Sequence, residues 1–413
     1  MRNLRGAYWA AAAFAVVLFA YDLNRLYALR YGADLGTFLQ TLVNWRHGST
    51  FNYGEWRPHL QVHDSWALIA LVPLIAVFPR AETLLAIQVL AVASAAIPLA
   101  LLGRELGLSP RAATIVAIAF LLTPSAQGLA YDNFSENVFV PVLAFSGVLA
   151  VVRNAWWPAI LLAIALCGIK EDSALFVVWF GAACAIWRDR RLGAAICAAG
   201  LVTLVAYWSI EHVLGVHPND PPYGFAVHDV SGKFTLTMLL LAPFAFAPLG
   251  VGRWLWLAVP LLVEIVFMQP WNYEASRIGS HYTAPLLAAA SVAAIAGVRR
   301  FPKLVPAIVP CALLVTLVIF SDTALRPGRW PYIVDWKAYG RAVAARESTV
   351  PVLLPRREEG VWAVAASNPL VRLDLRRDPD FVACPAYDTD ARAFFDSLRG
   401  VMPARLCGGV PVR

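Results

Sequence analysis

Charge and the signatures of soluble enzymes are both scarce in this sequence. Only 15% of its 413 residues are charged, whereas 59% are hydrophobic. The chain has no GxxxxGK[ST] phosphate loop, no GxGxxG after an expected strand, no GxSxG and no HExxH, which argues against ATP, dinucleotide, serine-hydrolase and zincin chemistry. Its six cysteines include no CxxC pair, so a metal-thiolate site has no support either.

The sequence contains instead a succession of long apolar runs, from residue 7 to about residue 320. Such runs, with a mean hydropathy of +0.61, are typical of a polytopic α-helical membrane protein. The first run, 7–27, follows Arg2 and Arg5 and is too long for a signal-peptide core, so it predicts an uncleaved signal anchor. Many of the 15 tryptophans lie near span ends, where indole rings anchor helices at the headgroups.

The apolar runs predict an all-α polytopic fold with about eleven crossings, followed by a small α/β extramembrane domain. One further apolar piece, 65–79, is too short and proline-marked for a firm span, and it predicts a re-entrant or short helix. The expected spans are 7–27, 82–102, 112–129, 138–152, 155–169, 173–187, 192–212, 234–250, 253–269, 281–298 and 304–320.

Basic residues in the short loops orient these spans. With eleven crossings all the basic loops face the cytoplasm, whereas a crossing at 65–79 would place nearly all of them outside. The positive-inside rule therefore predicts a cytoplasmic N-terminus and an extracytoplasmic C-terminus, in the cytoplasmic (inner) membrane of a prokaryote. The net charge of +7 serves this orientation and does not indicate nucleic-acid binding. The residues are Arg2, Arg5, Arg104, Arg111, Arg153, Arg188, Arg190, Arg191, Arg253, Arg299, Arg300 and Lys303.

The remaining ionisable residues fall almost entirely on the expected outer face. A polar residue in a loop is ordinarily just solvated. Lys170-Glu171-Asp172 departs from that pattern because it lies between two apolar segments with almost no linker, where charges must be paired or face a wet cavity. The outer-face candidates are Asp34, Glu55, His59, His63, Asp64, Asp132, Glu136, Lys170, Glu171, Asp172, His217, Asp220, His228, Asp229, Glu274, Arg277 and His281.

The first outer loop, 28–64, is expected to contain a helix. Apolar residues between positions 35 and 45 recur at helical spacing, with Gln40 and Asn44 on another face. This pattern predicts an interfacial amphipathic helix or a plain surface helix.

After residue 320 the composition changes to proline, charge and short apolar runs. Residues 1–320 therefore form the expected transmembrane domain, and residues 321–413 form the small α/β domain on the outer face. Cys384 and Cys407 in that domain could pair in an oxidising exterior, whereas the four cysteines of the apolar segments serve packing.

Carboxylates with nearby histidines and cations at a membrane surface suit a substrate that has a lipid tail and a charged head. A carboxylate can take a proton from an acceptor hydroxyl or hold a divalent cation against a phosphate. Lys170 and Arg277 could stabilise phosphate charge. His59 and His63 are spaced to share a metal on a helix, but Pro58 adjoins them and no third ligand is near in sequence. A divalent cation is left open as a cofactor.

A series of short motifs resembles a prokaryotic family of polytopic membrane proteins, the uncharacterised domain of unknown function 2079. The resemblance covers about residues 20–372. The second loop departs from the family pattern: it reads Asp132-Asn133-Phe134 where Asp-Phe-His is expected, so a histidine is missing. The motifs are Tyr31-Gly32-Ala33-Asp34-Leu35-Gly36-Thr37-Phe38-Leu39-Gln40, His63 before Pro73 and Pro79, Gln88 and Pro98, Thr123-Pro124, Tyr131-Asp132-Asn133-Phe134, Lys170-Glu171-Asp172 and His281-Tyr282-Thr283-Ala284-Pro285.

That family in turn resembles the GT-C superfamily, integral-membrane glycosyltransferases that use polyprenyl-phosphate sugars. The resemblance implies that Asp34 is the catalytic base or acceptor-positioning carboxylate and that Asp132 is the second acidic residue. It implies membrane lipids and a lipid-linked sugar as partners, with no nucleic acid, and it leaves oligomeric state open. The implied substrate-binding residues are Gln40, His63, Glu136, Lys170, Glu171, Asp172, Arg277, His281 and Tyr282.

Two other functions fit the same composition. A lipid or solute transporter or flippase needs ionisable groups deep in the spans, for which Glu264 and Asp22 are the candidates, but the sequence shows no convincing internal repeat. A non-catalytic envelope assembly protein would act through residues 321–413.

Overall fold

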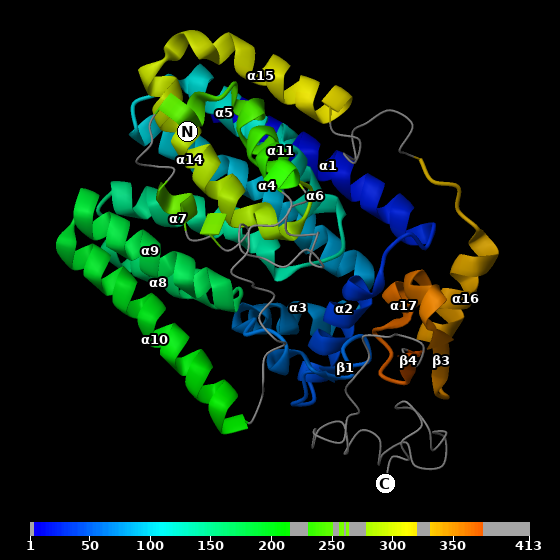
Figure 1. Ribbon diagram of the computed structural model, residues 1–413. Coiled ribbons are helices and arrows are strands. Elements are labelled where there is room, and N and C mark those ends of the chain that lie inside the picture. Colours follow the sequence, from blue (N-terminus) through cyan, green and yellow to red (C-terminus); the bar gives the residue numbers. More distant parts are fainter. Residues whose placement is uncertain are drawn as a thin grey trace. The chain divides into compact units, whose positions relative to one another are not determined.

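The computed structural model describes residues 4–214, 230–250, 256–259, 262–263, 278–319 and 331–374, which are predominantly helical (Figure 1). The chain contacts define two compact units. Unit 1 contains the described residues of Met1–Tyr21, Ile87–Asp132 and Glu136–Trp330. Unit 2 contains those of Asp22–Ala86, Asn133–Ser135 and Pro331–Arg413.

Four described helical stretches are long and apolar enough to cross a membrane: Arg5–Tyr27, Ala81–Glu105, Arg190–Ile210 and His281–Arg300. They contain α1 (Arg5–Tyr27), α4 (Ala81–Glu105), most of α10 (Arg190–Leu214) and α14 (Ala284–Arg300). The other apolar helices have 10–17 residues, too few for a hydrocarbon core that needs about 20 residues. The described helices therefore support four or five spans by length and composition, fewer than the eleven expected.

The expected span 112–129 is bent. Helix α5 (Pro110–Leu122) and helix α6 (Pro124–Tyr131) meet at an angle of 55° and count as a fifth span only if they are taken together. Pro124 cannot continue the hydrogen-bond ladder and forces Thr123 into an extended conformation, φ −64° and ψ 143°. The Thr123 hydroxyl accepts a hydrogen bond from the Ala126 amide at 3.1 Å, so it caps the new helix.

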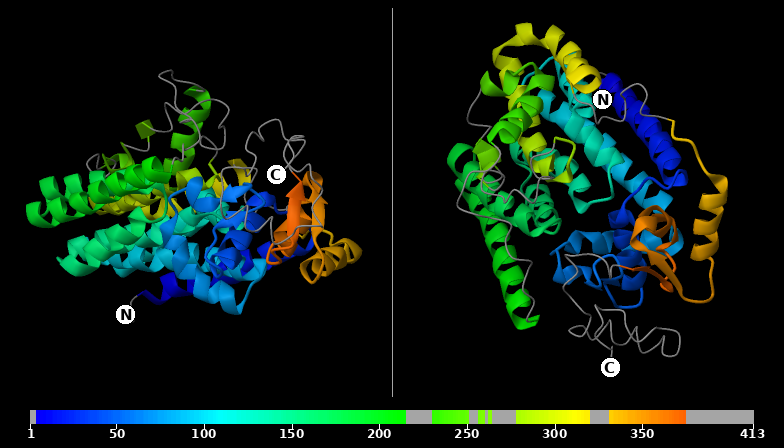
Figure 2. Two further views of the ribbon diagram at one scale, coloured as in Figure 1. Left: turned by 90° about the horizontal axis from the view of Figure 1, so that it is seen from below. Right: turned by 45° about the vertical axis from the view of Figure 1, so that its right-hand side comes forward.

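Helices α7 (Val140–Val152), α8 (Trp156–Cys167), α9 (Glu171–Trp187) and α10 form the next part of unit 1. Helices α9 and α10 lie side by side in both orientations of Figure 2. A Cβ on Gly181 or Gly193 would clash with the backbone of the opposite helix. These glycines therefore permit the close backbone approach that small residues give to membrane helices.

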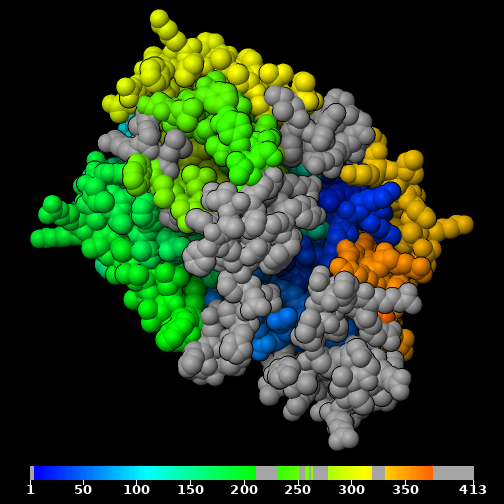
Figure 3. All heavy atoms as spheres, in the orientation of Figure 1, coloured from blue at the N-terminus to red at the C-terminus, as the bar shows by residue number. Residues whose placement is uncertain are grey.

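The outward surface of α10 is apolar. Leu201, Val202, Val205 and Trp208 are exposed by 50 to 69%, and the helix is visible at the surface in Figure 3. An apolar face of this kind is compatible with contact with lipid hydrocarbon.

The last elements of unit 1 are α11 (Val230–Leu241), α14 and α15 (Val305–Leu314). The expected span 234–250 is interrupted, because Ala245 and Phe246 have φ of 50° and 56°, a left-handed conformation that ends a helix. Most of the expected span 253–269, including Glu264, lies outside the described residues.

Helix α2 (Ala33–Trp45) forms the core of unit 2 and confirms the predicted helix in the first outer loop. The hairpin of β1 (Phe51–Asn52) and β2 (Arg57–Pro58) follows it, and then come 3₁₀ turns over His59–Gln61 and Trp66–Leu71 and the short helix α3 (Val72–Val77). The prediction that α2 exposes a polar face is wrong, because Thr37, Gln40, Thr41 and Asn44 are all buried. Their polar atoms are satisfied by neighbouring loops and strands, which lets the helix be enclosed.

The described C-terminal residues complete unit 2. Helix α16 (Trp336–Arg346) is followed by β3 (Val352–Pro355), α17 (Glu359–Ala365) and β4 (Val371–Asp374). The two strands pair in parallel, with Val352 opposite Val371, and α17 is the crossover between them. The described part of the predicted 321–413 domain thus shares a core with the first outer loop, while the boundary at residue 320 stays a prediction. Cys384 and Cys407 lie outside the described residues.

Candidate functional site

The first candidate group surrounds Asp34 in unit 2. Asp34 is exposed in the first turn of α2, where the helix dipole favours a negative charge. Two hydrogen bonds fix the start of this helix. The Gly32 amide donates to the Asn133 side-chain oxygen at 2.9 Å, and the Trp362 indole donates to the Ala33 carbonyl at 3.2 Å. Asp34 is therefore an exposed carboxylate on a firmly held backbone.

Trp362 also explains Gly36 in the Asp34-Leu35-Gly36 motif. A Cβ at position 36 would clash with the indole ring of Trp362, which is fully buried. The carboxylate of Glu359, at the start of the same helix α17, lies beside Gly32, 3.5 Å from where a Cβ there would stand. Sequence reasoning missed Asn133, Glu359 and Trp362 as neighbours of α2, because no spacing rule links residues separated by 100 or more positions.

Gln40 holds the core of unit 2 together. Its side-chain nitrogen donates to the Val371 carbonyl at 3.1 Å, and its side-chain oxygen accepts from the Tyr53 amide at 2.7 Å. Gln40 is fully buried. The structure places it in a positioning role, linking α2 to β4, and its predicted contact with substrate stays a prediction.

Glu55, in the turn of the β-hairpin, lies together with His59 and His63, which follow the hairpin. The Nδ1 atom of His59 lies 3.0 and 3.1 Å from the two carboxylate oxygens of Glu55, and the two imidazole rings are 5.7 Å apart. Burial alone would raise the pKa of Glu55, but His59, Asn52 and His63 outweigh burial and lower it. Among the described residues, no group of three or more His, Cys, Asp or Glu could hold a metal ion. In the structure, His59 thus forms an acid-imidazole pair with Glu55, and His63 lies beside it.

The second candidate group surrounds Lys170 in unit 1. Lys170 is only 5% exposed, between the end of α8 and the start of α9, and its Nζ lies 4.8 Å from the centre of the Tyr282 ring. Burial would lower the pKa of Lys170, but Tyr282, Glu171, Glu136 and Asp172 outweigh burial and raise it. The ammonium is therefore charged and compensated, as expected for an ionisable group placed between apolar helices.

The loop that carries Tyr282 is positioned by α6. A Cβ on Gly128 of α6 would clash with the backbone of Gly279, so the loop lies directly on this helix. The ring of His281 lies 4.3 Å from that of Tyr282. The structure thus gathers Lys170, Tyr282 and their acidic neighbours from three separate stretches of sequence, and it confirms that Lys170-Glu171-Asp172 is no freely solvated loop.

Asp132 ends helix α6 and is partly buried. The Gln88 side chain donates to the carbonyl oxygens of Ala130 and Asp132 at 3.0 and 2.9 Å, which fixes this helix end. Asp132 belongs to unit 1, whereas Asp34 belongs to unit 2. Arg277 lies outside the described residues.

Chemically, the two groups offer different functions. Asp34 can accept a proton from a hydroxyl group or orient it. The Lys170 group combines a charged ammonium with several carboxylates, so it can bind an anion, relay protons or neutralise a charge that develops in a reaction.

Part of the chain matches a family model. Residues 25–218 match the model of a family described as predicted membrane protein (DUF2079), which is somewhat less than half of the chain. The matched stretch contains Asp34, Asp132 and Lys170 but not His281 or Tyr282. No curated protein matches the chain. The match supports a resemblance to a membrane-protein family of unknown function, and the apolar helices agree with a chain that crosses the bilayer several times.

Proposed function

We propose that this protein is an integral-membrane glycosyltransferase that moves a sugar from a polyprenyl-phosphate donor to an acceptor on the outer face of the membrane. The proposal rests on the position of Asp34. This exposed carboxylate lies in the first turn of a helix whose backbone is fixed by Asn133 and Trp362. A catalytic carboxylate must be accessible and held in place, and rigid elements provide this better than loops.

In the proposed reaction, the acceptor oxygen attacks the anomeric carbon of the donor sugar while the bond from that carbon to the phosphate oxygen breaks. Asp34 takes the proton of the acceptor hydroxyl, and the bonding electrons leave with the polyprenyl phosphate. Asp132 is the proposed second acidic residue. Lys170 is the proposed partner of the phosphate, because a buried, charged ammonium stabilises negative charge more strongly than one in water.

The other expected contributors follow from the same proposal. Glu171, Asp172, Glu136, Tyr282 and His281 surround or adjoin Lys170 and would contact the donor headgroup. His63, Gln40 and Arg277 are proposed as further substrate contacts, and a divalent cation could be held only with help from substrate oxygens, since the described residues offer no complete set of ligands.

The proposed topology has about eleven crossings and one re-entrant or short helix at 65–79. It places the N-terminus in the cytoplasm and the α/β domain outside, in the inner membrane of a prokaryote. Single helices such as α8, with 12 residues, would complete a crossing together with the residues that flank them, since a helix of this length is shorter than the hydrocarbon core.

A transporter or flippase is the second candidate, and one observation favours it. Asp22 is fully buried, and its Oδ1 atom accepts a hydrogen bond from the Tyr31 hydroxyl at 2.9 Å. Together with the buried Lys170, it places ionisable groups of both signs within a largely apolar chain, the arrangement expected for proton or solute pathways.

Mass spectrometry of lipid-linked sugars separates the two candidates. Cells that carry the intact gene are compared with cells that lack it. Loss of a transferase leads to accumulation of one polyprenyl-phosphate sugar and disappearance of one envelope glycan. Unchanged lipid-linked sugars together with altered solute or lipid distribution would replace the transferase by a transporter.

A further inference from the structure

A further candidate site lies in unit 1, where Lys170 is not among the lining residues. It is a cavity of about 160 Å³ between α7 and α9. An engineered apolar cavity of ~150 Å³ stays dry and takes up a hydrocarbon such as benzene. The cavity is lined by Leu106, Val148, Val151, Val152, Phe180, Ala183, Cys184, Trp187, Arg188 and Leu257.

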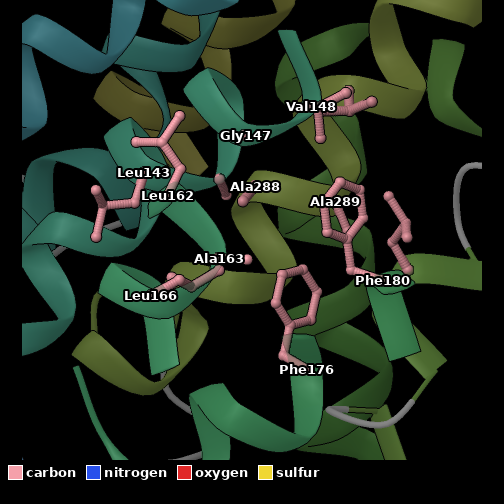
Figure 4. A pocket seen from close by; sticks show the side chains of 13 residues that line it. Leu143, Gly147, Val148, Leu162, Ala163, Leu166, Phe176, Phe180, Ala288 and Ala289 are labelled. Carbon is pink, nitrogen blue, oxygen red and sulfur yellow. The ribbon is translucent and has the colours of Figure 1, made fainter. Parts of the chain in front are cut away.

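A second, smaller cavity adjoins this one in the helix bundle. This fully apolar cavity of about 20 Å³ shares Val148, Phe180 and Leu257 with the larger one. Figure 4 shows how Gly147, Ala163, Ala288 and Ala289, from α7, α8 and α14, leave this space open between larger side chains. The two cavities thus lie next to each other, and the larger one has room for a short hydrocarbon segment about the size of benzene.

Arg188 is the only charged residue that lines the larger cavity. Its Nη2 atom donates to the Val152 carbonyl at 3.0 Å and to the Asn154 side-chain oxygen at 3.2 Å. These bonds hold the guanidinium at the ends of α7 and α9, and Arg188 is also exposed at the surface. An anionic group at this place would meet an arginine whose planar fork is already oriented.

The surrounding loops are also basic. The bonds of Arg188 bring the end of α9 to the loop after α7, and the ion pair of Arg153 with Glu105, 2.7 Å, brings that loop to the end of α4. Asp189, the other acidic residue here, accepts hydrogen bonds from the Arg191 and Leu192 amides at 2.8 and 3.0 Å. These segments therefore contain more arginines than carboxylates. The arginines are Arg104, Arg153, Arg188, Arg190 and Arg191, and the carboxylates are Glu105 and Asp189.

We propose that this cavity binds an anionic phospholipid, with the part of one acyl chain next to the headgroup in the apolar cavity and the phosphate at Arg188. The positive-inside rule places these basic loops at the cytoplasmic leaflet, where anionic lipids are attracted by about 1 kcal/mol for each basic residue. The proposal does not depend on the glycosyltransferase reaction.

Native mass spectrometry of the full-length protein in an uncharged detergent tests this site. Phosphatidylglycerol and phosphatidylcholine with the same acyl chains are each titrated, and the bound fraction is measured. The wild type is expected to bind phosphatidylglycerol about tenfold more tightly, the factor that corresponds to one charge-assisted hydrogen bond.

Three variants locate the site. Arg188→Gln is expected to remove the tenfold preference, and Ala183→Leu, which fills the cavity, to weaken both lipids. Arg111→Gln removes the same charge from an exposed residue that does not line the cavity, so it should keep the preference. Equal binding of the two lipids by the wild type, or equal loss in Arg188→Gln and Arg111→Gln, would overturn the proposal.

Discussion

At the scale of single residues, the unusual feature of this protein is the use of ionisable groups in apolar surroundings. Lys170 is buried and Glu55 is partly buried, and in each case the neighbouring groups outweigh burial and favour the charged form. Such groups are costly when a partner is removed, because the remaining charge has no solvent to replace it. They are therefore fixed points of the structure as well as candidates for chemistry.

The pair of Glu55 and His59 gives a pH-dependent contribution to stability. The folded-state pKa of Glu55 is lowered below its ordinary value of 4.5. Its contribution is therefore fully present above about pH 4.5 and is lost as the pH falls through the lowered folded-state pKa. Glu55→Gln should lower the free energy of unfolding by about 1.5–3 kcal/mol at pH 7 and by less at low pH.

Thermal unfolding in detergent at pH 7 and at pH 4 measures this difference. Glu347→Gln is the matched control, because the Glu347 side chain is 68% exposed. An equal loss in both variants at pH 7 would contradict the role given to the pair.

At the scale of elements, helices α2 and α17 pack so closely at Gly36 that no side chain fits between them. Gly36→Ala places a methyl group against the indole of Trp362 and should destabilise unit 2 by about 1–3 kcal/mol. Gly340→Ala, in α16, meets no atom within 4 Å and should stabilise by about 0.4–1 kcal/mol. Tryptophan fluorescence during thermal unfolding follows both variants, and a harmless Gly36→Ala would show that the two helices do not pack as described.

The sequence predicts these elements unevenly. Apolar spacing between residues 35 and 45 is enough to predict α2, since periodicity is a local signal. The spacing could not predict that the polar face of α2 is buried too, because Gln40 donates to the Val371 carbonyl on β4, more than 300 residues later. Trp56, which follows α2, likewise donates to the Leu373 carbonyl on β4. Thr123-Pro124 is a local signal for the end of a helix, but hydropathy alone predicted α5 and α6 as one span.

The candidate site was predictable to a similar degree. Lys170-Glu171-Asp172 stands out because a charged triplet between apolar segments must be compensated. The resemblance named Lys170 and Tyr282 separately as substrate-binding residues, but the sequence did not predict their contact, because the two are more than 100 residues apart. The neighbours of Asp34 on α17 had no sequence signal at all.

At the scale of the whole molecule, the testable property is orientation in the membrane. The positive-inside rule predicts that the loop after α2 faces outward and the loop before α5 faces the cytoplasm. In a cysteine-free background, His47→Cys should react with a membrane-impermeant maleimide in intact cells, whereas Arg111→Cys should react only after permeabilisation. Both positions are exposed. The opposite pattern would place Asp34 in the cytoplasm and remove the basis of the outer-face reaction.

The most direct test of the account is complementation of the deletion strain with Asp34→Asn, followed by mass spectrometry of polyprenyl-phosphate sugars and envelope glycans. Asp335→Asn is the control, because Asp335 is also an exposed helix-terminal aspartate of unit 2. The account predicts that Asp34→Asn reproduces the donor accumulation and glycan loss of the deletion, by a factor of about 10² or more in product, while Asp335→Asn restores the wild-type pattern. Full restoration by Asp34→Asn at equal protein abundance would contradict it.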